Sequence, residues 1–205
     1  MAQMALPLHV GADARRIVVG QGNAAVVEAL AHPQTWPFRT AVLTGPARSG
    51  KSLLARWFVE SGLGEAIDDA DRVDETVLFH RWNRTQEAGI PLLLVATTAT
   101  EGTAWRIALP DLASRLGAAL QLAILPPDDA MLAELITAHA EARGLVITPE
   151  GAAWLATRCE RSHLGPERLI ATIDRISLER KAAPGPAIWR EALEELSGPE
   201  QPSLL

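Results

Sequence analysis

Apolar residues in the first part of the chain form short continuous runs separated by stretches with helical spacing. Short apolar runs that end at glycine, threonine or an acid, or just before proline, predict buried parallel strands. These runs are 40–45 (TAVLTG), 63–71 (LGEAIDDAD, the weakest), 90–98 (IPLLLVATT) and 118–125 (AALQLAIL). The stretches with helical spacing are 23–32, 52–61, 73–89 and 109–117. This alternation predicts an α/β fold with a small, mostly parallel sheet of four strands and helices on both faces.

From residue 128 onward the strand signals disappear and only helical patterns remain. Thr148 followed by Pro149 is typical of a helix start, because the threonine can cap the first turn and proline suits the first helical position. The predicted helices lie in 127–144, 148–161, 165–181 and 186–198. We therefore expect an N-terminal arm at 1–12, an α/β nucleotide-binding domain at 13–127, an all-helical lid at 128–198 and a loose tail at 199–205.

Composition narrows the class of protein. The 205 residues are 48% hydrophobic and 21% charged, which argues against global disorder. A net charge of -6 argues against a free-standing nucleic-acid binder, because such proteins neutralise phosphates. The single cysteine, Cys159, suits a reducing compartment, and its side chain is expected to be a small buried apolar group. The apolar runs are too short to span a bilayer, so we expect a cytoplasmic protein without membrane contact.

The clearest chemical motif is GPARSGKS at 45–52, which matches the P-loop pattern G-x-x-x-x-G-K-[ST] between a predicted strand and a predicted helix. Its glycines let successive backbone N–H groups face a phosphate at the positive end of the following helix. Lys51 is expected to contact the β- and γ-phosphates of ADP or ATP, and the Ser52 hydroxyl to join the shell of Mg²⁺. The expected nucleotide-binding residues here are Gly45, Pro46, Ala47, Arg48, Ser49, Gly50, Lys51, Ser52 and Leu53.

Acidic residues follow the second predicted strand. We expect Asp68 to hold Mg²⁺ through water and Asp69 to orient the attacking water; the alternative is an exposed acidic turn. A threonine at the end of the third strand, Thr97 or Thr98, is a candidate sensor of the γ-phosphate, although threonine is also common in buried strands.

The first residues include QMALPL at 3–8, which is unusually apolar for a chain end. Pro7 disfavours a helix there and keeps the segment extended. No basic residues precede it, so a secretory signal fits poorly. The residues alone leave two interpretations open: an arm packed on its own domain, or a short linear peptide for the groove of a partner.

The motifs taken together resemble AAA+ ATPases, and more closely DnaA and the Hda family, the regulatory inactivators of DnaA. The resemblance covers nearly the whole chain and rests on the P-loop, IDDAD, LLLVATT, LPDLASRL and the helical lid. It implies that Val19 and Gly20, within IVVGQGN, contact the nucleotide base. It also implies that Arg115 is an arginine finger that acts in trans on a neighbouring ATP. A surface arginine paired with Asp111 or Glu101 is the alternative for Arg115, and Arg106 is a second candidate finger.

The same resemblance explains the opening segment. Hda proteins carry a peptide that binds the DNA polymerase sliding clamp, its beta subunit. The resemblance implies that Gln3 enters a polar subsite of the clamp, that Met4, Leu6 and Leu8 fill a hydrophobic cleft, and that Pro7 lowers the entropic cost of ordering the peptide. The implied partners are the clamp and DnaA, with DNA reached only through the clamp; a homo-oligomer is compatible.

Two departures from the family pattern stand out. Only a helix and a short link separate Lys51 from Asp68, so one strand–helix unit of the usual AAA+ module is missing. In the lid, alignment on Arg175 puts Glu167 where the second sensor arginine is expected, and Arg168 follows one residue later. We therefore expect weak or absent intrinsic hydrolysis.

The expected function is negative regulation of DNA replication initiation, by stimulating hydrolysis of the ATP that DnaA holds. Nothing after Gly185 has the length or charge of a DNA-binding helix-turn-helix domain, which favours the inactivator over DnaA itself. The alternatives are a self-contained ATPase of the helicase-loader type and a nucleotide-gated clamp adaptor that stimulates no hydrolysis.

Overall fold

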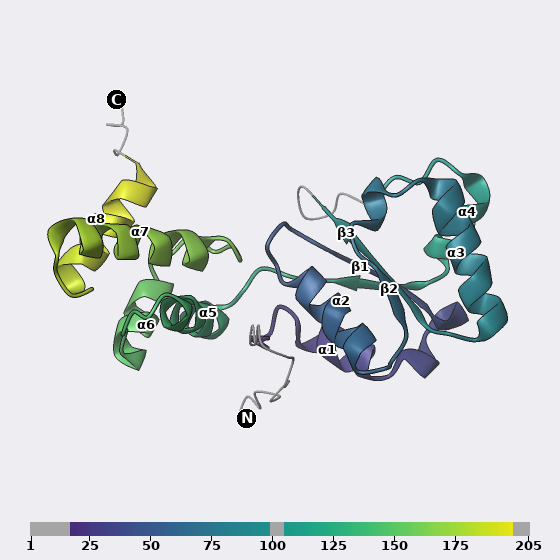
Figure 1. Ribbon diagram of the computed structural model, residues 1–205, viewed down its shortest axis with the longest axis horizontal. Coiled ribbons are helices and arrows are strands. Elements are labelled where there is room, and N and C mark those ends of the chain that lie inside the picture. Colours follow the sequence, from purple (N-terminus) through teal and green to yellow (C-terminus); the bar gives the residue numbers. More distant parts are fainter. Residues whose placement is uncertain (1–16, 99–104, 199–205) are drawn as a thin grey trace, which may run out of the picture. The chain divides into compact units, whose positions relative to one another are not determined.

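The chain forms two compact units, divided between Leu125 and Pro126, in a computed structural model that describes residues 17–98 and 105–198 (Figure 1). The helices and strands of the first unit are α1 (Ala24–Ala31), β1 (Thr40–Gly45), α2 (Lys51–Glu60), β2 (Glu65–Ile67), α3 (Glu75–Ala88), β3 (Leu92–Thr97), α4 (Pro110–Gly117) and β4 (Leu120–Ala123). Three single-turn 3₁₀ helices join them, at Pro33–Thr35, Pro37–Arg39 and Ala70–Arg72.

The four strands form one parallel sheet in the order β2-β3-β1-β4. This confirms the predicted four-stranded parallel sheet. The two central strands, β1 and β3, are almost wholly buried, as expected of strands covered on both faces. The edge strand β2 has only three residues, and Glu65 at its start pairs with Arg81 and Arg84 of α3. A short, charged edge of this kind resists pairing with other chains.

Alternate residues of the central strands belong to two separate hydrophobic cores, one on each face of the sheet. Leu43 of β1 packs in a cluster with Leu30 of α1 and Phe58 of α2. Its neighbour Val42 points to the opposite face and joins a cluster with Trp82 of α3 and Leu112 of α4. The sheet therefore carries α1 and α2 on one face and α3 and α4 on the other, as the strand–helix alternation predicts.

Asn23 lies directly before α1, where asparagine often caps a helix, but its side chain does not cap α1. Its side chain has no capping hydrogen bond to the helix. Instead, Oδ1 accepts from the N–H of Gly20 and Nδ2 donates to the carbonyl of Val18, both at 2.9 Å. Both groups of the buried amide are used in holding the preceding loop, so neither remains for the helix.

The second unit is entirely helical among its described residues. It contains α5 (Asp129–Ala142), α6 (Pro149–Ala156), α7 (Gly165–Arg180) and α8 (Pro186–Ser197). The predicted cap is confirmed, since Thr148 accepts from the N–H of Gly151 at 3.2 Å. Leucine and isoleucine side chains from all four helices form one core, which includes Leu132, Leu155, Ile173 and Ile188. Within 17–98 and 105–198 no helix is both long enough and apolar enough to cross a membrane.

Candidate functional site

The P-loop lies between the end of β1 and the start of α2, where the motif requires it. Gly50, the residue before α2, has φ +88°, a left-handed conformation that glycine adopts without a steric penalty. The loop also packs tightly where it leaves the strand. A Cβ on Gly45 would meet Ser49 Oγ at 3.1 Å and Ile124 Cβ at 3.2 Å. The loop is thus tightly packed where it leaves β1, and it leads directly into the N-terminal end of α2, the end at which a helix favours a phosphate.

Lys51 turns back onto the loop that it belongs to. Its Nζ donates to the carbonyl of Gly45 at 2.9 Å and to that of Pro46 at 2.6 Å, and the residue is only 5% exposed. This burial lowers the pKa of Lys51, and the nearby charges of Asp68, Asp69 and Asp71 partly oppose the shift. A cation held in this way is stabilised further by any anion that enters the loop.

Ser49 provides an independent test of whether a phosphate fits. Its hydroxyl oxygen is buried and has no hydrogen-bond partner within the described parts of the chain. A buried polar atom without a partner is destabilising, and a phosphate oxygen is a strong acceptor for a hydroxyl. The unsatisfied hydroxyl and the inward cation therefore both fit an anionic ligand. Ser52, the expected Mg²⁺ ligand, is exposed, so its hydroxyl is accessible.

Of the three acidic residues of IDDAD, which follow β2, two are exposed to solvent and the third contacts the sheet. Asp68 and Asp69 are both exposed, and Asp68 accepts from the backbone N–H of Asp69 at 3.1 Å. Asp71 is half-buried and accepts from the backbone N–H of Thr97 at 3.3 Å. Thr97 ends β3 directly opposite Gly45 of β1, so Asp71 links the acidic turn to the strand beside the P-loop. Sequence reasoning missed this third acid, although it belongs to the same IDDAD stretch.

The segment predicted to contact the base, 17–23, also lies at the carboxyl ends of the strands. Asn23 holds Val18 and Gly20 as described above, and the carbonyl of Gly22 accepts from the N–H of Leu125, just beyond β4, at 2.9 Å. Gly20 is buried and Val19 is half-buried. The predicted roles of Val19 and Gly20 stay predictions, but the segment lies by the carboxyl end of β4, next to that of β1, where α/β sheets bind ligands.

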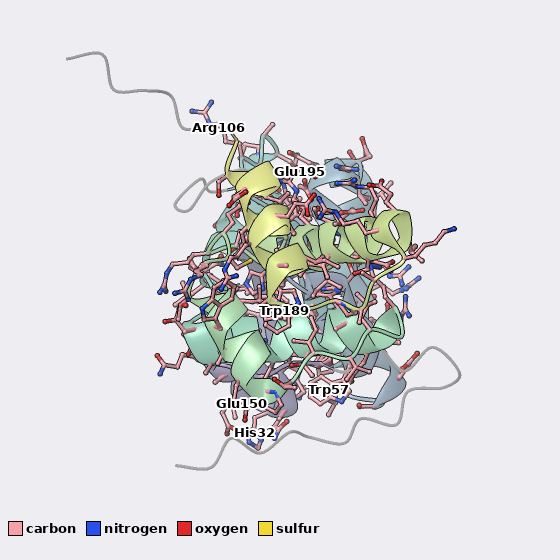
Figure 2. All side chains as sticks on the ribbon, turned by 90° about the vertical axis from the view of Figure 1, so that its left-hand side faces the viewer. His32, Trp57, Arg106, Glu150, Trp189 and Glu195 are labelled. Carbon is pink, nitrogen blue, oxygen red and sulfur yellow. The ribbon has the colours of Figure 1, made fainter. Side chains whose placement is uncertain are left out.

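Arg115, the predicted finger, packs against aromatic rings. Its Cζ lies 4.3 Å from the ring centroid of Trp82 and 5.0 Å from that of Phe79, both on α3. Neither ring was expected as a partner of Arg115; the alternative partners were Asp111 and Glu101, and Glu101 lies outside the described residues. Arg106 lies before α4 and is exposed (Figure 2).

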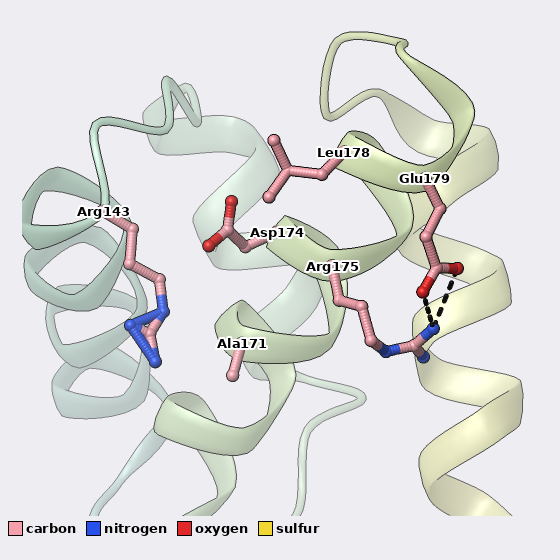
Figure 3. A pocket seen from close by; sticks show the side chains of 6 residues that line it. All are labelled: Arg143, Ala171, Asp174, Arg175, Leu178 and Glu179. Atoms are coloured by element: carbon pink, nitrogen blue, oxygen red, sulfur yellow. Dashed lines mark hydrogen bonds and ion pairs between the residues drawn. The ribbon is translucent and has the colours of Figure 1, made fainter.

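The lid places its candidate sensor at the surface. Arg168, in the first turn of α7, is exposed and lies 3.8 Å from the carboxylate of Glu160. Further along α7 is a shallow, open groove, lined by Arg143, Ala171, Asp174, Arg175, Leu178 and Glu179 (Figure 3).

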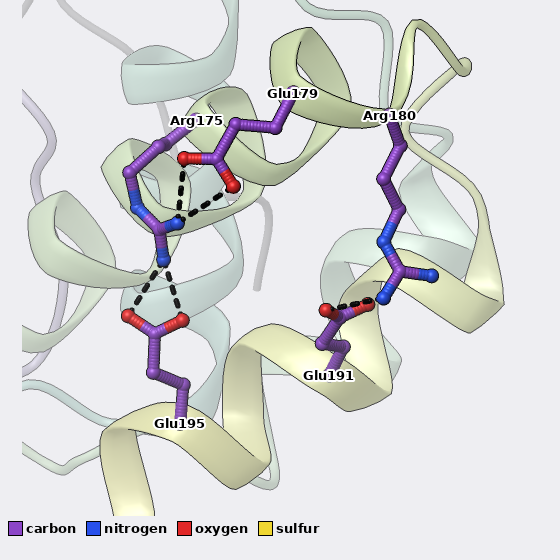
Figure 4. A network of polar contacts seen from close by, with 5 residues as sticks. All are labelled: Arg175, Glu179, Arg180, Glu191 and Glu195. Carbon is purple, nitrogen blue, oxygen red and sulfur yellow. Dashed lines mark hydrogen bonds and ion pairs between the residues drawn. The ribbon is translucent and has the colours of Figure 1, made fainter.

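Ion pairs hold α7 against α8. Arg175 contacts both Glu179 and Glu195, while Arg180 pairs with Glu191 at 2.6 Å (Figure 4). These hydrogen bonds raise the pKa of Arg175 above its ordinary value. Arg175 thus pairs with carboxylates of both α7 and α8, and the role of Arg168 as second sensor stays a prediction.

The peptide predicted to bind the clamp, with Gln3, Met4, Leu6, Pro7 and Leu8, lies outside the described residues. Thr98, the other candidate sensor, is described, and its backbone N–H donates to the carbonyl of Gly45 at 3.1 Å. Thr97 and Thr98 thus both lie next to the start of the P-loop.

Solved structures with a similar fold include two of the replication initiator DnaA and one of RuvB. Domain III of the Thermotoga maritima replication initiation protein DnaA is 16% identical, with a TM-score of 0.69 over 89% of this chain and 95% of that chain. The Thermotoga maritima RuvB Holliday junction branch migration motor is 20% identical, with a TM-score of 0.60 over 87% of this chain and 70% of that one. The replication initiator DnaA bound to AMPPCP and single-stranded DNA is 14% identical, with a TM-score of 0.54 over 80% and 66%.

No family model and no curated protein matches the sequence. At these identities the likeness to solved structures concerns the fold. The chain has the P-loop AAA+ architecture that its sequence predicted, with a small parallel sheet flanked by helices and followed by a helical unit.

Proposed function

We propose that this protein binds ADP or ATP with Mg²⁺ at the P-loop and acts on DnaA as a negative regulator of DNA replication initiation. The nucleotide part is supported by the inward cation of Lys51 and the unsatisfied hydroxyl of Ser49. Ser52 and Asp68 would hold Mg²⁺, which in such sites is shared between one or two side chains and the phosphates. When bound, the metal would offset negative charge on the phosphates.

The regulatory part is carried by the likeness to domain III of DnaA, which extends over 95% of that domain. A protein that shares this fold can present its α4 to the nucleotide of DnaA in the manner of a neighbouring AAA+ subunit. Arg115 then stabilises the charge that develops on the transferred phosphoryl group, and arginine fingers contribute on the order of 10³–10⁵ in rate. Asp69 would orient the attacking water at this protein's own P-loop, where weak or absent hydrolysis is expected, and Arg168 stays the candidate second sensor of the lid.

Docking on the sliding clamp is the third part of the proposal, and it rests on the sequence of residues 3–8. Gln3 and the apolar side chains that follow it would occupy the clamp groove in an extended conformation. The clamp encircles DNA, so this protein would need no DNA-binding surface of its own, in keeping with its net charge of -6.

The decisive experiment measures ATP turnover by DnaA and by this protein, separately and mixed, with and without DNA-loaded clamp. We expect little turnover by this protein alone and a large stimulation in the mixture that contains the loaded clamp. High turnover by this protein alone would favour a self-contained ATPase of the helicase-loader type. Clamp binding without stimulation would favour a nucleotide-gated adaptor.

Arg115→Ala tests the assignment of the finger. Stimulation should fall by a factor of roughly 10³ or more, while binding of nucleotide and clamp should persist, because neither predicted site contains Arg115. Arg106→Ala is the matched control, since Arg106 is an exposed arginine shortly before α4. Loss of stimulation in the Arg106 variant alone would transfer the role to that residue.

A further inference from the structure

One face of α3 supports both α4 and the segment that leads into it. Glu75, Phe79 and Trp82 are spaced at i, i+4 and i+7, so they lie along the same side of the helix. The two rings contact the guanidinium of Arg115, with centroids 5.0 Å and 4.3 Å from Cζ. Arg115 belongs to the last turn of α4. The rings therefore hold the end of α4 that carries the predicted finger.

Glu75 holds the other end of α4. One carboxylate oxygen accepts from the N–H of Ala108 at 2.9 Å, and the other accepts from the N–H of Leu109 at 2.6 Å. Leu109 is the residue immediately before α4, which begins at Pro110. A single side chain thus fixes the direction in which the chain enters the helix, because it binds two successive backbone amides.

Trp82 is itself firmly held. The residue is only 7% exposed, and its Nε1 donates to Thr40 Oγ1 at 3.1 Å. Thr40 is the fully buried first residue of β1, which ends at the P-loop. The indole ring is therefore part of the core of the sheet, and it cannot reorient without breaking that hydrogen bond.

We propose that Glu75, Phe79 and Trp82 are positioning residues that orient the guanidinium of Arg115 toward the nucleotide of a neighbouring AAA+ protein; this rests on the proposed function. The reason lies in the shape of the guanidinium. Its flat face attracts aromatic rings, whereas its N–H donors point outward in the plane of the group. A guanidinium stacked on rings can still present donors to phosphate oxygens. The stack also restricts its rotamers before the partner arrives, which removes an ordering cost.

The test compares four variants in the clamp-dependent ATPase assay with DnaA. Phe79→Leu removes a ring but keeps an apolar side chain, and we expect the maximal stimulated rate to fall about 10- to 100-fold, as displacement of a catalytic group does. The protein concentration for half-maximal stimulation should not change. Phe79→Tyr restores a ring and should restore the rate. Val77→Ala is the matched control on α3, because Val77 is 58% exposed and should behave as wild type.

Glu75→Gln provides a second variant in case loss of the ring disturbs folding. It keeps one acceptor oxygen and loses the other, so it should lower the maximal rate without raising the half-maximal concentration. The positioning role is overturned if Phe79→Leu and Glu75→Gln both stimulate at the wild-type rate. It is equally overturned if they change only the half-maximal concentration, because that result would indicate a role in docking.

A measurement without DnaA separates this proposal from the function on which it rests. Aromatic rings shift the NMR signals of protons that lie over them. Signals of the Arg115 side chain, assigned by their loss in Arg115→Lys, should be shifted upfield in wild type and less so in Phe79→Leu. Upfield shifts combined with no stimulation by wild type would refute the proposed function but support the observed stack. Unshifted signals would refute the stack, whatever the ATPase assay shows.

Discussion

Replacing Lys51 by methionine tests the P-loop, and the structure sets the size of the expected effects. Methionine keeps most of the apolar stem and removes the ammonium group. The carbonyls of Gly45 and Pro46 then lose a donor, which is destabilising. The buried charge also disappears, which is stabilising because removing a desolvated charge recovers its solvation cost. These changes oppose each other, so we expect the free energy of unfolding to change by less than about 1 kcal/mol.

Nucleotide affinity should change far more. An ammonium and a phosphate charge at a separation of about 4 Å attract each other by roughly 4 kcal/mol at the effective dielectric constant typical of protein sites. That energy corresponds to about a thousandfold in the dissociation constant. Equilibrium titration with a fluorescent ADP analogue measures the affinity, and thermal unfolding of the same samples measures stability.

The chain offers a close control for this experiment. It contains only one other lysine, Lys181, which follows α7 and is exposed. Lys181→Met removes the same charge from the whole protein and should leave nucleotide affinity unchanged. Wild-type affinity in a folded Lys51→Met variant would refute the assignment of the P-loop. A collapse of the melting temperature would instead show that Lys51 is a structural residue.

The lowered pKa of Lys51 also predicts how nucleotide affinity depends on pH. Burial lowers this pKa in the free protein, whereas a bound phosphate raises it by favouring the charged form. Binding therefore takes up a proton once the pH exceeds the lowered pKa. Affinity should be constant below that pH and should fall as the pH rises from the free-state pKa toward the bound-state pKa. NMR of the two lysine side chains in the chain would give the pKa directly, and a pH-independent affinity across it would contradict this linkage.

Three further predictions test other parts of the structure. Asp71→Ala should lower the free energy of unfolding by about 1–2 kcal/mol, because it removes the acceptor for the N–H of Thr97, whereas Asp71→Asn should cost less; equal effects would argue against the hydrogen bond. Burial raises the pKa of Cys159 to about 11, so iodoacetamide at pH 8 should label it slowly in the native protein and rapidly in urea; fast native labelling would contradict the burial. Replacing Leu6 and Leu8 together by alanine should cost several kcal/mol of clamp affinity, since each leucine contributes roughly 1.5–3 kcal/mol, without changing the melting temperature. A lower melting temperature with unchanged clamp binding would instead mean that the arm packs on its own domain.

The sequence predicted the fold well where local pattern and packing agree. β1 and β3 are continuous apolar runs because both faces of the sheet are covered, so their burial left a direct signal. The cap at Thr148 was predictable for a similar reason, since a helix end is decided by a few neighbouring residues. The P-loop was predictable because its glycines, lysine and serine have a fixed spacing in the sequence.

Contacts between segments distant in the sequence were not predictable in this way. Arg115 was predicted to be a finger, with a nearby acid as the alternative partner, but the packing of α4 on α3 that brings two aromatic rings to its guanidinium left no signal in the sequence. Asp71 reaches the backbone of Thr97 only because β2 pairs with β3. Asn23 stands where helix caps stand, yet the loop before it competes for the same amide. For each of these residues, the sequence indicated what the side chain could bind but not which group it would bind.

The strand order has a consequence for how the protein is made. β1 is the first of the four strands to leave the ribosome, and the two strands that flank it, β3 and β4, are made later. The hydroxyl of Thr44 in β1, for example, donates to the carbonyl of Leu122, which lies 78 residues further along the chain. At about 5–20 residues per second, synthesis of that interval takes roughly 4–16 s. Throughout it, the apolar TAVL segment of β1 has no β4 edge to pair with, and for much of it no β3 edge. Nascent chains at this stage therefore expose unpaired strand edges of β1, and translation speed between β1 and β4 should affect the yield of folded protein.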